Sequence, residues 1–309
     1  MNRITTTPAS SPQTSSSIET EACLLGVLSV AAFALTLPCA KALSGHLSAI
    51  QIGLFRSVLA ALVAAPVLLF IGSARPNFSQ FKRLLLMSLG VVYGFPVLTA
   101  VGMQHVPVGH GGVVLAALPL ATAIFGTLIT RDSPPAFFWL ASVGGFVAVA
   151  LFAGLRSEQG GGFYLGDLAL LGAVVLAGFG YAQGGALSKE MEGWEVMCWA
   201  LVLNLPILAM LSLWQFDASQ FETFGPIQWG ALAFLAFVNS LLGFFSWNRA
   251  LALGGIQRIS QLQLLQPFFT YGYSILLMGE HFDPLALVAC VTVIALVVVS
   301  KRALIKRTH

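Results

Sequence analysis

Charged residues are scarce in this chain of 309 residues: Asp, Glu, Lys and Arg make up only 9% of it. Soluble domains carry about a quarter charged residues. Apolar residues make up 57% of the chain, and its mean hydropathy is +0.87. This composition excludes an ordinary soluble domain and predicts a polytopic membrane protein.

Cysteine is also sparse, and the signatures of common catalytic sites are missing. The four cysteines lie scattered in apolar runs, with neither metal-ligand spacing nor a pairing pattern, so we expect buried thiols and no metal site. The chain contains no nucleophile elbow, HExxH pair, P-loop or dinucleotide fingerprint. The sequence therefore favours neither an enzyme nor an ATP-driven pump, and it predicts no cofactor.

Ten apolar stretches, each of about the 20 residues that a spanning helix needs, follow one another between short polar or Gly/Pro-rich segments. They lie near 22–40, 48–71, 83–103, 107–129, 135–154, 164–187, 195–214, 227–249, 256–278 and 284–301. Residues 1–18 are rich in Ser, Thr and Pro and are expected to form a disordered cytoplasmic tail, and 303–309 form a basic one. The predicted fold is an all-α polytopic membrane protein with ten transmembrane helices.

The net charge of +3 gives no reason to expect nucleic acid binding, but the distribution of basic residues predicts orientation. With the N-terminus inside, twelve basic residues face the cytoplasm and only Lys41 and Arg156 face outside. The twelve are Arg3, Arg75, Lys82, Arg83, Arg131, Lys189, Arg249, Arg258, Lys301, Arg302, Lys306 and Arg307. Both termini are therefore expected in the cytoplasm of a bacterium, with the protein in its inner membrane. Arg56 falls inside a span, where we expect it to snorkel or pair with an acid, with a substrate contact as the alternative.

One sequence pattern occurs twice, 148 positions apart and without gaps. Residues 105–132 read HVPVGHGGVVLAALPLATAIFGTLITRD, and residues 253–280 read LGGIQRISQLQLLQPFFTYGYSILLMGE. The shift pairs proline with proline, threonine with threonine and a closing acid with a closing acid. Such self-similarity predicts two related five-helix halves, 22–155 and 163–302. Because five spans is an odd number, the second half must insert upside down, as in many secondary transporters.

Polar residues at helical spacing mark one face of the second copy of this pattern. They are Ser260, Gln263, Pro267, Thr270 and Ser274. Pro267 cannot donate a backbone hydrogen bond, so we expect a kink and a free Gln263 carbonyl beside a cavity. Ser260 and Gln263 then either contact substrate or form hydrogen bonds between helices.

Other candidate site residues each have a structural alternative. Asn239 could donate to a substrate carboxylate or join two helices. Four aromatic residues could face the cavity or simply pack: Tyr93, Tyr181, Trp247 and Tyr271. Pro119 and Pro267 are predicted to kink their helices, and His110 could serve as a gate or lie at the membrane interface.

The chain resembles the drug/metabolite transporter superfamily, specifically its EamA-type ten-helix carriers. The resemblance covers about 22–302 and is carried by SWNRALALGGIQRISQLQLLQPFF with the closing LLMGE, and by GMQHVPVGHGG with ALPLATAIFG. Asp132 departs from the glutamate more usual at the end of the first copy. The resemblance implies a central cavity lined by spans one, three, four, six, eight and nine, with spans five and ten at the periphery. Length and aromatic content are similar to aromatic amino acid exporters of the YddG type.

These observations predict a carrier that works by alternating access and exports small amphipathic metabolites, aromatic or hydrophobic amino acids first. No acidic residue lies near the middle of a span, so we expect facilitated diffusion or exchange rather than proton coupling. The expected partners are a small-molecule substrate and the bilayer, and the protein is expected to work as a monomer. A broad drug or nucleotide-sugar carrier, or a scaffold or receptor that transports nothing, remain alternatives.

Overall fold

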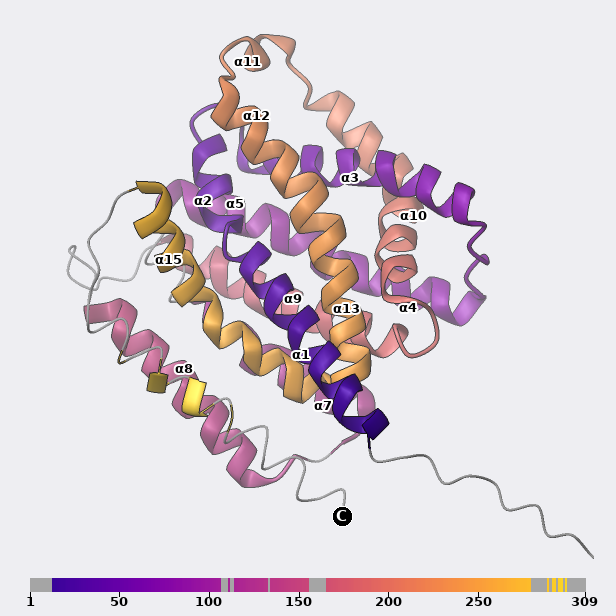
Figure 1. Ribbon diagram of the computed structural model, residues 1–309. Helices are drawn as coiled ribbons and strands as arrows, with labels where there is room; N and C mark the ends of the chain where they lie inside the picture. Colours follow the sequence, from indigo (N-terminus) through magenta and orange to yellow (C-terminus); the bar gives the residue numbers. More distant parts are fainter. Residues whose placement is uncertain are drawn as a thin grey trace, which may run out of the picture.

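The structure, a computed structural model, describes residues 13–106, 111, 114–132, 134–155 and 165–278, together with isolated positions between 288 and 298. This described part is helical throughout and contains no strand (Figure 1). Its helices are α1 (Gln13–Phe33), α2 (Thr36–Leu43), α3 (Ala49–Ile71), α4 (Phe78–Ser88), α5 (Phe95–His105), α7 (Leu118–Thr130), α8 (Ala136–Leu155), α9 (Leu165–Leu187), α10 (Gly193–Trp214), α11 (Ala218–Glu222), α12 (Pro226–Ala233), α13 (Gly243–Gly254), α14 (Ile256–Ser260) and α15 (Gln266–Met278). Two π-helical segments, η1 (Leu89–Gly94) and η2 (Phe234–Leu242), and one 3-10 segment, η3 (Gln261–Leu265), join consecutive helices.

Six helical stretches of the described chain are long and apolar enough to cross a membrane. They are Ser17–Leu43, Ala49–Ile71, Phe78–His105, Gly166–Leu187, Gly193–Trp214 and Pro226–Gly254. Their outward residues are apolar: Leu69, Phe70 and Leu213 are 81%, 90% and 75% exposed. Such a surface is stable against lipid and not against water, so the protein is an integral membrane protein. The count of ten spans stays a prediction, because the predicted tenth span lies mostly outside the described residues.

Local sequence signals set the ends of the second spanning helix. The Ser48 hydroxyl accepts a hydrogen bond from the Gln51 backbone N–H at 3.2 Å, and the Gln51 side chain accepts one from the Ser48 N–H at 2.8 Å. This capping box satisfies two backbone donors at the start of α3. At the other end Gly72 adopts φ +72°, which glycine tolerates without strain, and the helix stops.

The bundle is built from pairs of long helices that lie side by side. The first span packs against α13, α3 packs against α10, and α9 packs against α5 and α7. Glycines permit the closest approaches: a Cβ on Gly90 of η1 would lie 2.2 Å from the Leu176 carbonyl oxygen of α9. Small residues are expected at such contacts, because packing drives helix association in lipid. At the edge of the molecule lies α8, which contacts only α7 and η3 closely among the described elements (Figure 1).

Several helix boundaries recur 148 positions apart in the two halves of the chain. Helix α7 begins at Leu118 and α15 at Gln266, a shift of 148 positions. The π-helical segments η1 and η2 end at Gly94 and Leu242, which is again a shift of 148. Related sequences therefore interrupt their helices at the same points in both halves of the chain.

The proline of each copy lies in the first turn of a helical segment, not inside a continuous helix. Pro119 is the second residue of α7, and Pro267 is the second residue of α15. A first-turn position needs no backbone donor, so proline fits there without loss. The Gln263 carbonyl, expected to be free, accepts a hydrogen bond from the Gln266 N–H, because the chain tightens into the 3-10 turn of η3 before the proline. The ninth predicted span is thus divided into segments.

Candidate substrate-binding site

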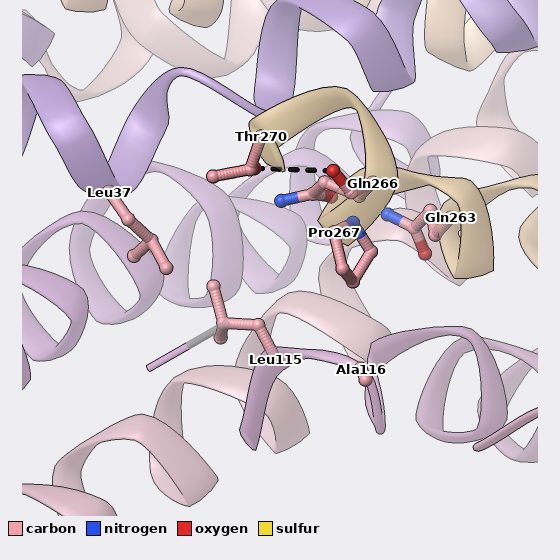
Figure 2. A pocket seen from close by; sticks show the side chains of 7 residues that line it. All are labelled: Leu37, Leu115, Ala116, Gln263, Gln266, Pro267 and Thr270. Carbon is pink, nitrogen blue, oxygen red and sulfur yellow. Dashed lines mark hydrogen bonds between the residues drawn. The ribbon is translucent and has the colours of Figure 1, made fainter. Parts of the chain in front are cut away.

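A pocket lies where the first span meets the two copies of the proline motif. It holds about 260 Å³ of space not filled by atoms, part of it open to the surroundings. Its lining comprises Leu37, Leu115, Ala116, Gln263, Gln266, Pro267 and Thr270. Figure 2 shows Leu37 and Leu115 across the pocket from Pro267. Because that figure includes open space, the enclosed part is far smaller than the roughly 300–1,000 Å³ of a site for a small ligand, and the pocket is nearly closed in this conformation.

Gln263 is the residue of this lining whose polar atoms lack partners. Its side chain is 2% exposed, and neither Oε1 nor Nε2 makes a hydrogen bond to a described residue. An unbonded buried amide costs about 1–3 kcal/mol relative to one that is satisfied. No described residue supplies the bond between helices that was one interpretation of Gln263. The amide is therefore available to a ligand in the pocket.

Helix α15, which follows the η3 turn that carries Gln263, is attached to the first span at a break in that span. Helix α1 ends at Phe33 and α2 begins at Thr36, so carbonyl groups near the break lack helical partners. Three side chains of α15 donate to carbonyls on this span. They are Gln266 to Phe33 at 3.4 Å, Thr270 to Ala34 at 3.0 Å and Tyr273 to Ala31 at 3.0 Å. We call these three bonds the α1–α15 latch.

Four rings form a buried aromatic cluster around the end of α1. Tyr181 lies 6.2 Å from Phe33, 5.5 Å from Phe244 and 5.8 Å from Trp247, measured between ring centroids. Phe33 also lies 6.1 Å from Trp247. The Trp247 indole Nε1 is buried and has no hydrogen-bond acceptor. Two predicted site residues, Tyr181 and Trp247, therefore lie in contact, together with two rings that sequence reasoning did not single out.

Asn239 lies in a buried polar network around Arg56. Its Oδ1 accepts from Arg56 Nη2, and its Nδ2 donates to the Thr36 hydroxyl at 2.7 Å. Arg56 also donates to the Ser240 hydroxyl, from Nε at 3.1 Å and from Nη2 at 2.9 Å. The expectation that Arg56 snorkels or pairs with an acid was wrong: the residue is 3% exposed, and its partners are neutral. The physical reason is that α3 packs against η2, which presents Asn239 and Ser240 to the guanidinium.

The other predicted site residues are dispersed. Ser260 is buried, but its hydroxyl donates to the Gln257 carbonyl at 3.0 Å, within its own helical segment. Tyr93 is half-buried and donates to Asn204 Oδ1 at 3.1 Å, a contact between the third span and α10. Tyr271 is half-buried on α15. His110 lies outside the described residues.

Comparison with known proteins identifies the family. The model of the EamA-like transporter family matches residues 20–154 and again 164–301. The chain belongs to the EamA-like transporter family. It is 38% identical to the uncharacterized transporter YdeK of Bacillus subtilis over 244 residues, which are 79% of this chain and 84% of that protein.

More distant relatives of this EamA-like transporter extend the comparison. The chain is 24% identical over 257 residues to a probable terminal-alkyne amino-acid exporter of Streptantibioticus cattleyicolor, covering 81% of this chain and 82% of that one. A solved crystal structure matches with a TM-score of 0.73 at 15% identity, over 94% of this chain and 99% of the other. That likeness concerns the fold alone.

Sequence reasoning about this EamA-like transporter missed one residue that the structure makes prominent and predicted the wrong environment for another. Gln266 lines the pocket and belongs to the α1–α15 latch, yet it lies off the polar face that was traced at helical spacing. The 3-10 turn of η3 rotates it into the pocket, so a purely α-helical projection could not find it. Arg56 was noted as a cation inside a span, but its buried network with Asn239 and Ser240 was not predicted, because it depends on how α3 packs against η2.

Proposed function

We propose that this EamA-like transporter exports small amphipathic metabolites, with hydrophobic and aromatic amino acids as the first substrate class. The observation that carries the proposal is the pocket with the buried Gln263 amide, which has no described partner, at its wall. A pocket of mixed apolar and polar lining suits a small molecule that combines a hydrophobic part with a few polar groups. A scaffold that transports nothing has no need for an unsatisfied amide at a pocket.

The amino acid class has two supports. The Streptantibioticus cattleyicolor relative is named a probable terminal-alkyne amino-acid exporter, and the chain aligns with it over most of both lengths. The aromatic cluster of Phe33, Tyr181, Phe244 and Trp247 adjoins the break in the first span, beside the residues that line the pocket. Aromatic rings stack favourably on aromatic or apolar side chains. An exporter of the YddG type is the finest form of the proposal.

The proposed architecture is ten helices in two inverted five-helix repeats. The equal shift of 148 positions between the starts of α7 and α15, and between the ends of η1 and η2, supports two related halves. Ion pairs support the proposed orientation: Arg83 with Glu190, and Arg249 with Glu21 and Glu192. Each pair joins residues that the basic-residue rule places on the cytoplasmic side.

The proposed mechanism is alternating access around the pocket. Movement of α15 away from the first span would break the α1–α15 latch and enlarge the nearly closed site. The prolines and the 3-10 turn of η3 divide the ninth predicted span into segments that can move separately. Without an acid at mid-depth, we propose facilitated diffusion or exchange, with the direction set by the substrate gradient.

Counterflow in reconstituted vesicles tests the proposal. Vesicles loaded with one unlabelled compound from a panel of amino acids, nucleotide sugars and cationic drugs are diluted into labelled compound, and uptake is followed. Fastest exchange of phenylalanine, tryptophan or leucine is the expected result. Faster exchange of nucleotide sugars or cationic drugs would show that the proposed substrate class is wrong. If the folded protein exchanges none of the compounds, the scaffold alternative is favoured.

A further inference from the structure

The charge of Arg56 has no counter-ion in the described part of the protein. The residue is 3% exposed on α3, inside a spanning helix, and no described carboxylate lies within ion-pair distance of it. By contrast, Arg83, Arg249 and Arg258 each pair with a glutamate at the polar end of the bundle. A buried cation without an anion is unfavourable in a medium of low dielectric constant. Its retention therefore calls for a specific explanation.

The donors of this guanidinium are only partly used. Nε and Nη2 donate to Ser240 and Asn239, whereas Nη1 donates to no described residue. Guanidinium carries five N–H groups, and these three bonds leave the two N–H groups of Nη1, which can donate to a carboxylate oxygen. Asn239 is itself held by Thr36 at 2.7 Å, so the network fixes the arginine in one orientation. The arrangement is a positioned cation with unused donors.

A hydrogen-bonded contact between helices does not require a charged residue at this position, as the other half of the chain shows. The shift of 148 positions takes Arg56 to Asn204 on α10. Asn204 donates to the Ser88 hydroxyl at 2.9 Å and accepts from the Tyr93 hydroxyl at 3.1 Å, so it joins α10 to the third span. A neutral amide thus makes the equivalent helix contact. The positive charge at position 56 must serve something else.

Arg56 also lies beside groups that suit the rest of a ligand. Its partner Asn239 lies on η2, which continues directly into α13, the helix that carries Phe244 and Trp247 of the aromatic cluster. Thr36, which completes the Arg56 network through Asn239, directly precedes Leu37 of the pocket lining. One helix, α2, therefore connects the cation with the pocket.

Resting on the proposed function, we propose that Arg56 binds the carboxylate of the transported molecule. The substrate class is then a small monocarboxylate with a hydrophobic part, which includes hydrophobic amino acids and excludes uncharged drugs and cations. Asn239 and Ser240 are positioning residues that hold the guanidinium. The aromatic cluster and the pocket take the hydrophobic part of the same molecule.

Binding of phenylacetate and phenylacetamide to the full-length protein in detergent tests this proposal directly. The two probes have the same shape and differ in charge. We expect the wild-type protein to bind phenylacetate tighter by roughly ten- to a hundredfold, the range for a hydrogen bond to a charged group. Arg56→Gln should abolish this preference. The matched control Asn204→Ala removes the equivalent uncharged helix contact and should keep it.

An equal affinity of the wild-type protein for both probes, or binding of neither, would overturn the proposal. The proposal would also be overturned if Arg56→Gln kept the preference for phenylacetate over phenylacetamide, or if Asn204→Ala lost it as well. If Arg56→Gln does not fold, Arg56→Lys keeps the charge but lacks the positioned Nη1 donors, and an undiminished preference in it would overturn their role in binding the carboxylate. Counterflow separates the two proposals: charge preference without flux refutes transport alone, whereas equal exchange of phenylalanine and phenylalaninamide refutes the role of Arg56 alone.

Discussion

The rings of Phe33 and Tyr181, which lie 148 positions apart in the sequence, stack on each other with centroids 6.2 Å apart and planes inclined by 14°. Other positions related by this shift also meet. Leu115 and Gln263 line the same pocket, and Ala116 packs with Leu264 in one apolar cluster. A residue meets its own equivalent only where the two copies of a repeat come together. The pocket therefore lies at the junction of the two halves of the chain.

Replacing Gln263 by leucine should reduce exchange at least about tenfold without lowering stability. A substrate group that bonds to the amide would lose its partner, whereas an apolar side chain removes an unsatisfied buried group from the folded protein. Counterflow and thermal unfolding measure the two effects. Gln104→Leu, at an exposed glutamine of α5, is the matched control and should change neither. A parallel loss of folded protein and flux would instead favour a structural role for Gln263.

Weakening the α1–α15 latch should change how fast the pocket opens more than how well the protein folds. Thr270→Val and Tyr273→Phe each remove one hydrogen bond to a carbonyl of the first span. A bond between helices in a membrane averages about 0.6 kcal/mol, so each variant should alter the exchange rate about threefold. Thr292→Val, at an exposed hydroxyl bonded within its own turn, serves as the control. Identical rates in all variants would show that α15 does not move in transport.

Pro267→Ala should leave stable protein with a reduced maximal rate of exchange. Alanine supplies the N–H that proline lacks, so the Gln263 carbonyl can form an ordinary helical bond and η3 can merge with α15. A continuous helix has fewer points of movement than a segmented one. Initial rates at saturating substrate provide the measurement. An unchanged maximal rate would show that the division of this span into segments is not needed for transport.

Topology is testable by labelling single cysteines in a background without the four native ones. Cysteines at Arg83 and Lys306 should be protected from an impermeant reagent added outside, while those at Arg156 and Glu222 should react. This outcome follows from the bias of basic residues and an even number of spans. Strong external labelling at position 306 would contradict the proposal of inverted halves.

Energy coupling is decided with sealed vesicles that hold equal substrate on both sides and an imposed pH difference. We expect no net accumulation, because the described spans hold no carboxylate at mid-depth. Asp167, which is 5% exposed near the start of α9, is the acid most able to change this result. Sustained accumulation that an ionophore abolishes would establish proton coupling, and Asp167→Asn would then test that residue.

The sequence was a good guide wherever the signal was local. Apolar run length and low charge predicted an integral membrane protein of helices, and both are confirmed in the described residues. The motif residues predicted the EamA-like family, which is also confirmed. Among the site candidates, Gln263 and Pro267 line the pocket, because a polar stripe in an apolar span must avoid lipid.

What the sequence determined by itself is therefore the class of protein, its family and the repeated pattern, since each depends on composition and spacing within short stretches. The tertiary structure alone decided which polar groups are satisfied. Asn239 is bonded to Arg56 and Thr36, the side-chain amide of Gln263 has no partner among the described residues, and α15 is attached to carbonyls of the first span. These outcomes depend on contacts between residues roughly 200 positions apart, set by how helices pack and where π and 3-10 turns rotate a side chain. No pattern along one helix carries that information.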